Sequence, residues 1–232
     1  MTTTPIVVLD YPTTDDAMRL VRTLGDRCRF YKVGSELFTA AGPSIVERVR
    51  ETGAHVFLDL KFHDIPNTVR GAARSAAALG VQLLTVHASG GLDMLRAAVD
   101  GAGTTAGVLA VTVLTSFDDA SLGDAMGRPD VRTAAEVVRL AETAATAGAH
   151  GIVCAGTDVP AVRARFEDRL ALLVPGIRLA GGASHDQRRV VTPREAATLG
   201  ATYIAVGRAV TAAADPSAAM ETVLAELESI PA

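Results

Sequence analysis

Short apolar runs rich in β-branched residues alternate with helix-like stretches along the whole chain. The runs are Ile6–Tyr11, Phe30–Gly34, His55–Lys61, Leu83–Ala88, Gly107–Leu114, His150–Ala155, Leu170–Ile177 and Thr202–Gly207. The stretches between them have helical spacing, as in Val131–Ala147, where apolar residues recur at i, i+3, i+4 and i+7. This alternation is typical of a parallel sheet covered by helices.

The number of units favours a closed barrel. Runs that are apolar on both faces, such as 108–111, suit strands buried between an interior and a helix layer. About eight strand–helix units in 232 residues fit an α/β TIM (β/α)₈ barrel. A doubly wound sheet is the alternative, but it needs fewer strands and a glycine fingerprint after the first, where this chain has Asp10-Tyr11-Pro12. Because no linker divides the chain, we predict one barrel domain over residues 1–232.

The region around the seventh run is the least regular. Asp158-Val159-Pro160 opens only a short helix before Leu170, so the sixth or seventh unit is the weakest. The segment Arg178–Thr192 has no clear period and contains Gly181-Gly182. Such a loop after the seventh strand is a candidate lid over an active site.

Composition excludes several classes of protein. With 22 basic and 26 acidic residues, a net charge of −4 and no Trp, broad nucleic-acid binding is not expected, so bound phosphate needs a local site. Cys28 and Cys154 have no CxxC partner, which argues against a disulfide framework or a thiolate zinc site and favours a reducing cytoplasm. The first apolar run ends at Asp10 and is too short for a signal peptide or a membrane span.

Polar residues collect where the predicted strands end. The set comprises Asp10, Lys32, Asp59, Lys61, His87, Thr115, Ser116, Arg178, Gly207 and Arg208. The starts of the strands carry no comparable set. Because the chemistry of a TIM barrel lies at the carboxyl ends of its strands, we expect the active site there.

Asp59 and Lys61 are two oppositely charged members of this set on the same predicted strand. As i and i+2 neighbours, ~6–7 Å apart along a strand, they share one face, and we expect that face to be the barrel axis. Buried charge needs partners, so Asp10, Lys32 and Asp64 are expected to join them in a network. The alternatives are a structural ion pair of Asp59 and Lys61, a solvated strand-end Lys32, and an Asp64 that only caps the following helix.

The segment 59–69, DLKFHDIPNTV, resembles the D-x-K-x-x-D-I-P-N-T signature of orotidine 5′-monophosphate decarboxylases. Supporting matches are Leu9-Asp10, 31–34, 86–91, 114–116, 174–178, 186–189, Thr192-Pro193 and 206–208. One departure is Thr85, two residues before His87, where Asn is expected, and it puts a contact behind the site in doubt. Related ribulose-phosphate-binding barrels, such as the hexulose-phosphate synthases and keto-gulonate-phosphate decarboxylases, have similar motifs and use a metal.

The resemblance implies a monofunctional homodimer with shared active sites. Asp64 and Thr68 would cross to the site of the partner, and Lys32 and Asp10 would hold the ribose hydroxyls. The remaining roles that it implies are Thr115 and Ser116 near the pyrimidine, Pro175 and Arg178 at a ligand-binding position, and Gln187 and Arg208 on the phosphate. Gly207 would leave the backbone open to that phosphate, and a plain strand-end turn is the alternative.

The implied reaction converts orotidine 5′-monophosphate to uridine 5′-monophosphate and CO₂, the last step of de novo pyrimidine biosynthesis. It leaves a carbanion at C6 that the ring carbonyls do not delocalise, and the chain has no signature for a cofactor acting as electron sink. We therefore expect Lys61, as an ammonium between Asp59 and Asp64, to stabilise the anion and deliver the proton.

Two other functions stay open. A metal-dependent sugar-phosphate lyase or isomerase would bind Mg²⁺ at Asp59 and Asp64, although Lys61 competes for the same place. A catalytically silent nucleotide-phosphate binding protein would keep the phosphate contacts alone. The histidines show no HExxH or H-x-H spacing, so we expect no histidine metal site, a hydrogen-bonded role for His87 and a packing role for His63.

Overall fold

The computed structural model describes residues 3–179 and 190–229 of the chain. Within these residues, eight parallel strands pair in chain order, and β1 also pairs with β8, so the sheet closes into a barrel. The strands are β1 (Thr4–Val8), β2 (Phe30–Gly34), β3 (His55–Phe62), β4 (Leu83–His87), β5 (Gly107–Val111), β6 (Gly151–Val153), β7 (Ala171–Val174) and β8 (Tyr203–Val206). The predicted (β/α)₈ barrel is confirmed.

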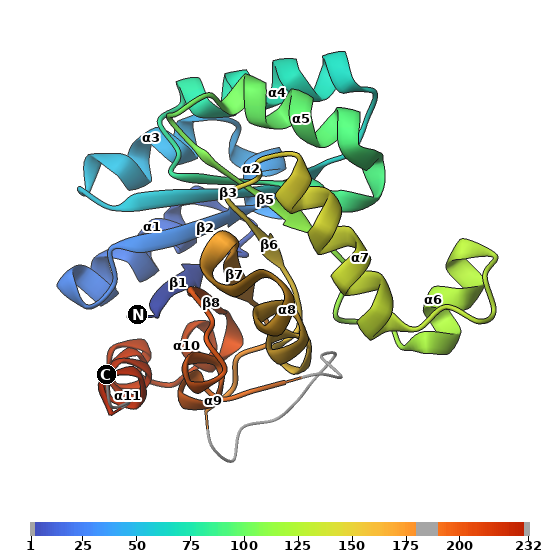
Figure 1. Ribbon diagram of the computed structural model, residues 1–232. Helices are drawn as coiled ribbons and strands as arrows, with labels where there is room; N and C mark the ends of the chain where they lie inside the picture. Colours follow the sequence, from blue (N-terminus) through green and yellow to red (C-terminus); the bar gives the residue numbers. More distant parts are fainter. Residues whose placement is uncertain (1–2, 180–189, 230–232) are drawn as a thin grey trace.

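Helices surround the barrel on its outside (Figure 1). They are α1 (Thr14–Leu24), α2 (Ser35–Ala41), α3 (Ser44–Glu51), α4 (Pro66–Ala78), α5 (Gly91–Ala102), α6 (Asp119–Met126), α7 (Thr133–Thr146), α8 (Val159–Phe166), α9 (Pro193–Thr198), α10 (Arg208–Thr211) and α11 (Pro216–Glu228). The helix predicted over Val131–Ala147 is α7, and the short helix expected after Asp158 is α8. Helix α6 had no separate prediction; it extends away from the barrel at the right of Figure 1.

Several strands are shorter than the apolar runs that predicted them. The first run was expected to continue to Tyr11, but β1 ends at Val8, and β5 ends at Val111 rather than Leu114. Leu9 and Val113, just beyond these ends, are buried all the same. Burial extends past the last strand pairing, so hydrophobicity alone overestimates strand length.

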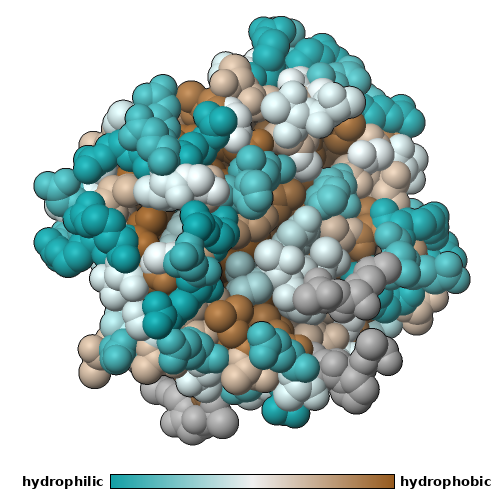
Figure 2. All heavy atoms as spheres, turned by 90° about the vertical axis from the view of Figure 1, so that its left-hand side faces the viewer, coloured by the Kyte–Doolittle hydropathy of each residue, from teal (hydrophilic) through white to brown (hydrophobic). Residues whose placement is uncertain are grey.

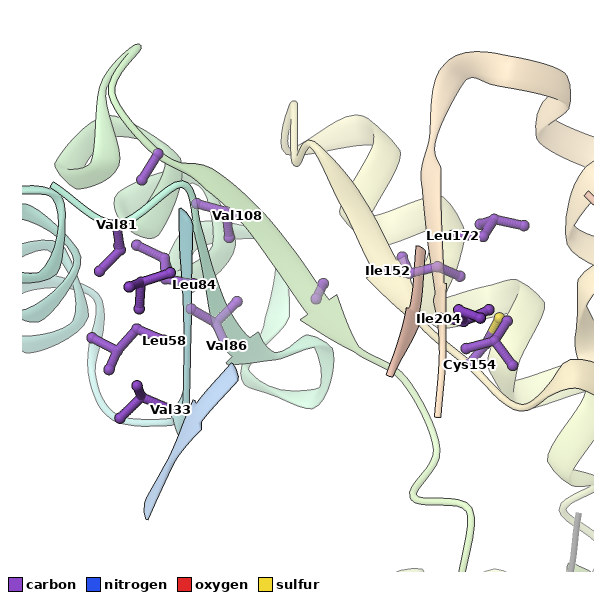
Figure 3. Packing of buried hydrophobic residues seen from close by; sticks show 14 of the residues in the cluster. Val33, Leu58, Val81, Leu84, Val86, Val108, Ile152, Cys154, Leu172 and Ile204 are labelled. Atoms are coloured by element: carbon purple, nitrogen blue, oxygen red, sulfur yellow. The ribbon is translucent and has the colours of Figure 1, made fainter. Parts of the chain in front are cut away.

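The core has two layers. The larger cluster lies between the strands and the helices, and Figure 3 shows Leu58, Leu84 and Ile152 among its members. A second cluster fills the barrel interior: Ile6, Val8, Phe30, Phe57, Leu83, Leu109, Leu173 and Ala205. The interior is therefore packed with side chains, as in other barrels of this kind. We expect an open site to lie beyond these side chains, at the carboxyl ends of the strands.

The two ends of the predicted lid segment are held together at its base. Ile177 and Val191 form a parallel bridge, and the N–H of Arg178 donates to the carbonyl of Val191 at 3.0 Å. Thr192 then caps α9 by accepting from the N–H of Glu195 at 3.1 Å, while Glu195 accepts from the N–H of Thr192. Most of the predicted lid, including Gln187, lies outside the described residues.

On the face drawn in Figure 2, apolar atoms are visible in limited areas between hydrophilic side chains. None of the helices in the described ranges is long and apolar enough to cross a bilayer.

Candidate active site

A cavity of about 480 Å³ opens at the carboxyl ends of the strands. Its volume is in the range of sites for small metabolites. The structure brings nine of the predicted site residues into its lining: Asp10, Lys32, Asp59, Lys61, Thr115, Pro175, Arg178, Gly207 and Arg208. Of the ten polar residues expected at the strand ends, eight line this cavity, and His87 and Ser116 do not.

Four charged side chains form a chain of alternating sign along one side of the cavity. Asp59 accepts from the Lys61 ammonium through Oδ1 at 2.8 Å, and its Oδ2 lies 3.1 Å from Lys32 Nζ. Lys32 Nζ also lies 3.1 Å from Asp10 Oδ1. Lys32 and Asp59 are 12% and 11% exposed, so this pair is shielded from water, and the solvated strand-end alternative for Lys32 is wrong.

These charges continue the inward-facing columns of the barrel. Phe30 and Phe57 belong to the interior cluster, and Lys32 and Asp59 stand two residues further along the same strands. Because side chains alternate along a strand, residues at i and i+2 face the same way. In β2 and in β3, a step of two residues thus leads from the apolar interior cluster to a charged residue that lines the cavity.

The regular alternation expected through Lys61 does not hold. The β3–β4 register shifts between Leu58 and Phe62, and Lys61 has a positive φ of 51°. The Lys61 N–H donates to Thr85 Oγ1 at 2.9 Å, and the Thr85 hydroxyl donates to Asp59 Oδ1 at 2.9 Å. Lys61 reaches the cavity from a bulged backbone, a feature that the sequence pattern did not predict.

The network shifts the pKa values of its buried members. Burial by itself would lower the pKa of Lys32, but the carboxylates of Asp59 and Asp10 outweigh it and hold that pKa above its usual value. Burial would likewise raise the pKa of Asp59, yet Lys32 and Lys61, with hydrogen bonds from Lys61 and Thr85, keep it below its usual value. Both residues therefore stay charged at neutral pH.

Gly34 leaves room for the outer ion pair. A Cβ at this position would lie 2.7 Å from Asp10 Oδ1 and 2.8 Å from Lys32 Nζ, both closer than packed atoms come. The φ of Gly34 is −92°, so the backbone does not require glycine here. The absence of a side chain is needed for space alone.

Three predicted residues lie away from the cavity of this chain. Asp64, Thr68 and Ser116 are exposed and do not line it. The interpretation of Asp64 as a helix cap is wrong: Ile65 is the N-cap of α4, and Asp64 Oδ1 accepts from the N–H of Ile65 at 2.6 Å.

His63 and His87 pack against each other, with ring centroids 5.4 Å apart. Burial, followed by the nearby His63 and Lys61, holds the pKa of His87 below its usual value. His87 is therefore neutral at pH 7. In residues 3–179 and 190–229, no group of three or more His, Cys, Asp or Glu side chains is arranged to hold a metal ion.

The opposite side of the cavity was missed by the sequence reasoning. Its apolar members are Val111, Val113, Val153, Cys154, Leu173 and Ala205, and they lie beside Thr115, Arg178 and Arg208 in the lining. We name these apolar members the apolar wall, and we name Asp10, Lys32, Asp59 and Lys61, together with the buried Thr85 that donates to Asp59, the charged wall. The inward-facing positions of the later strands would have predicted most of the apolar wall, because Val111, Val153 and Leu173 stand at those positions of β5, β6 and β7.

Comparisons with known proteins agree with this geometry. Residues 3–223 match the model of the family described as "Orotidine 5′-phosphate decarboxylase / HUMPS family". The orotidine 5′-phosphate decarboxylase of Anaeromyxobacter dehalogenans is 54% identical over 219 residues, which cover 94% of this chain and 96% of that protein. The protein of the same name from Nitrosococcus oceani is 47% identical and covers 97% of each chain.

Solved structures give the same result. The crystal structure of orotidine 5′-phosphate decarboxylase from Lactobacillus acidophilus superposes with a TM-score of 0.86 at 35% identity, covering 99% of this chain and 100% of that one. The one from Pyrococcus horikoshii superposes with a TM-score of 0.78 at 25% identity, covering 97% and 100%.

Proposed function

The chain belongs to the orotidine 5′-phosphate decarboxylase / HUMPS family, and we propose that it converts orotidine 5′-monophosphate to uridine 5′-monophosphate and CO₂ without a metal, Lys61 protonating C6. The decarboxylase activity, a step of pyrimidine biosynthesis, follows from the family and from relatives 42–54% identical over most of the chain. The observation that carries the rest is the Lys61 ammonium, 2.8 Å from Asp59 at the cavity.

The chemistry requires a fixed positive charge next to C6. Loss of CO₂ leaves an electron pair in the ring plane, where the ring carbonyls do not delocalise it. A preorganised ammonium stabilises such a charge without reorganising during the reaction, and it can then transfer its proton to the carbon. Lysine suits this role better than arginine, because a guanidinium does not give up its proton in proteins.

The composition of the chain supports this assignment. Lys32 and Lys61 are the two lysines of the sequence, and the other 20 of its 22 basic residues are arginines. Both lysines contact Asp59. Lysine therefore occurs only at the cavity, where one of the two has to lose a proton.

Asp59 has a second proposed role, toward the carboxylate of the substrate. Burial alone would raise the pKa of Asp59, but Lys32 and Lys61 outweigh burial and hold this pKa low. Asp59 is therefore anionic when substrate binds. A substrate carboxylate beside it would be repelled, and departure of CO₂ would relieve the repulsion. Asp10 and Lys32, further out in the same network, would hold the ribose hydroxyls.

The other side of the mouth suits the phosphate. Arg208 and Gly207 follow β8, the usual phosphate position in these barrels, and both line the cavity. We assign the phosphate to them together with Gln187. Arg178 is 9% exposed, donates to the carbonyl of Ile177 at 2.8 Å and lines the cavity with Pro175, and we assign both residues to ligand binding. We place Thr115 and Ser116 near the pyrimidine.

The arrangement of Asp59 supports metal independence. Each of its carboxylate oxygens already faces an ammonium, Lys61 at Oδ1 and Lys32 at Oδ2. A divalent cation at Asp59 would have to displace one of these partners and would meet the charge of the other. The same oxygens that would bind Mg²⁺ in a metal-dependent relative hold lysines in this chain.

We further propose that the enzyme is a cytoplasmic homodimer in which Asp64 and Thr68 complete the site of the partner. Asp64 is exposed beside Ile65, a large apolar side chain that is 68% exposed. Removing Ile65 from water in a dimer would stabilise the association and direct Asp64 toward the second copy. Both cysteines are buried thiols, in keeping with a reducing compartment.

The central experiment follows the loss of orotidine 5′-monophosphate in the presence of a chelator. We expect full turnover by the wild type and a loss of at least about 1000-fold in Lys61→Ala. Lys61→Arg is the matched control, because it keeps a positive charge but cannot donate the proton, and we expect it to be as inactive.

Three outcomes would contradict parts of the proposal. Activity that the chelator abolishes and added Mg²⁺ restores would disprove metal independence. Full activity of Lys61→Arg would disprove its role as proton donor. Thermal stabilisation by uridine 5′-monophosphate with no turnover at all would favour the silent binding protein.

The shared site has its own test. Lys61→Ala and Asp64→Ala should each be inactive, but a mixture of the two should regain about one quarter of the wild-type activity, because half of the dimers then carry one intact site. A mixture that stays inactive would contradict the sharing of Asp64 between subunits.

A further inference from the structure

Thr85 is a polar side chain with no exposed surface, and it touches two members of the charged wall at once. We infer that it is a positioning residue: it sets where the Lys61 ammonium points by holding both Asp59 and the backbone of Lys61. The inference rests on the proposed function for its kinetic consequence. Its structural consequence can be measured without any turnover.

The hydroxyl of Thr85 is used in both directions. It donates to Asp59 Oδ1 at 2.9 Å and accepts from the Lys61 N–H at 2.9 Å. Asp59 Oδ1 also accepts from the Lys61 ammonium at 2.8 Å. The three groups form a closed ring in which the two ends of Lys61, its backbone N–H and its ammonium, are tied to the same Thr85–Asp59 pair.

The backbone of β3 explains why such a tie is needed. On either side of the bulge, Leu58 pairs with Leu84 and Phe62 pairs with Val86, so the four-residue step on β3 faces a two-residue step on β4. The extra residues of β3 therefore lack the regular pairing with β4. The Thr85 hydroxyl serves as the acceptor for the Lys61 N–H.

Lys61 also adopts a conformation that its side chain disfavours. Its φ of 51° lies in the left-handed region, which residues with a Cβ rarely adopt. Such a conformation persists where the surroundings over-determine it, and it is often found at functional sites. Removing the Thr85 hydroxyl leaves the Lys61 backbone with one constraint fewer and should let the ammonium move from its place beside Asp59.

The decisive variants separate the hydroxyl from the shape of the side chain. Thr85→Val keeps the β-branched volume and removes both hydrogen bonds, while Thr85→Ser keeps the hydroxyl and removes a methyl group. Thr112→Val is the matched control: Thr112 is 6% exposed and its hydroxyl donates to the carbonyl of Val153 at 2.8 Å, outside the charged wall.

With orotidine 5′-monophosphate as substrate, we expect Thr85→Val to lower kcat about 10- to 100-fold, because small misplacements of a reacting group have effects of this size. KM should change little, since no contact of Thr85 with substrate is proposed. Thr85→Ser should keep most of the wild-type kcat, and Thr112→Val should keep all of it. Should Thr85→Val fail to fold, Thr85→Ala removes the same hydroxyl and serves in its place.

A second readout is independent of activity. Because the chain has two lysines, labelling lysine side chains with ¹⁵N and ¹³C gives two sets of ε-position NMR signals, which a Lys61→Arg variant assigns. We expect Thr85→Val to move the Lys61 signals and speed exchange of its ammonium protons, with a smaller change at Lys32. Thr112→Val should leave both unchanged.

The outcomes distinguish the positioning role of Thr85 from the proposed decarboxylase activity. Moved Lys61 signals in a protein that does not decarboxylate the substrate would uphold the positioning role and refute the proposed function. Unmoved signals together with a wild-type kcat in Thr85→Val would overturn the inference. So would an equal loss of kcat in Thr85→Ser and Thr85→Val, because a packing defect would then account for it.

Discussion

The two walls of the cavity face each other across the same mouth but are built from opposite kinds of side chain. The charged wall comes from β1–β4 and the ends of these strands, and it holds an unbroken series of ion pairs from Asp10 to Lys61. The apolar wall comes from β5–β8, where Val111, Val153 and Leu173 occupy the corresponding inward positions. The first half of the barrel thus supplies the series of ion pairs, and the second half supplies the apolar surface beside it, with Arg178 and Arg208 beyond the ends of its strands.

The apolar surroundings explain why the charges are arranged as a chain of alternating sign. Beside an apolar wall the effective dielectric constant is lower than in water, so each attraction and each repulsion is stronger. An unpartnered charge there would destabilise the fold, and Lys32 accordingly has a carboxylate on each side. Under the proposed function, the same low polarity would strengthen the field of Lys61 at a developing carbanion.

The strongest way to break the charged wall is Asp59→Asn. It leaves Lys32 and Lys61 facing each other without the carboxylate between them. We expect turnover to fall at least about 100-fold and the free energy of unfolding to fall by about 3–5 kcal/mol. Enzyme assays and denaturant unfolding measure the two effects.

Asp10→Asn is the control for stability, because Asp10 pairs with the same Lys32 but is 55% exposed. Its loss should change the free energy of unfolding by no more than about 1 kcal/mol. Equal destabilisation by the two variants would show that burial does not set the strength of the network.

A smaller but local disturbance is Gly34→Ala. The new methyl group would displace the Asp10–Lys32 pair, so we expect kcat/KM to fall about 10- to 100-fold. Gly71→Ala in α4 is the matched control, since a Cβ there meets open space and helix propensity favours alanine by up to about 1 kcal/mol. Unchanged kinetics in Gly34→Ala would mean that the pair tolerates movement.

The apolar wall can be tested with Val153→Thr, which adds a hydroxyl with almost no change of shape. A hydroxyl on this wall should lower the free energy of unfolding by about 1 kcal/mol. We expect its effect on turnover to be smaller than that of Asp59→Asn or Gly34→Ala. A larger loss of turnover would show that the apolar wall needs its low polarity as strictly as the charged wall needs its charges.

The smallest expected effect concerns pH. Because burial, His63 and Lys61 lower the pKa of folded His87, the unfolded chain takes up a proton first as the pH falls below about 6.5. The contribution of His87 to stability is therefore full above that pH and is lost below it. Thermal unfolding of His87→Gln should show a weaker fall in Tm between pH 7 and pH 5 than the wild type. Parallel curves for the two proteins would contradict this assignment.

Much of the architecture could be predicted from local pattern. The alternation of apolar runs and helical stretches predicted all eight strands in the described part of the chain, and β2 has the predicted bounds Phe30–Gly34. The i, i+2 spacing of Asp59 and Lys61 predicted that both reach the mouth. Strand ends were less predictable, because Leu9 and Val113 are buried without belonging to a strand.

Other features depend on how neighbouring strands and loops pack. The bulge at Lys61 arises from the register of β3 against β4, which no run of residues in β3 specifies. In the sequence Thr85 was only a departure from an expected Asn, whereas in the fold it contacts both Asp59 and Lys61. Asp64 was expected in the network, yet in this chain it is exposed and lies outside the cavity lining.

Local sequence pattern was enough to predict which residues of the regular strands face the barrel axis, as far as Asp59 in β3, because side-chain direction along a strand repeats every two residues. The sequence also determined the chemistry available there, with both lysines and two aspartates at strand ends. Only the tertiary structure decided how these groups meet. Register shifts, a positive φ and the approach of Thr85 from the next strand result from packing between segments distant in the chain, and local periodicity carries no information about them.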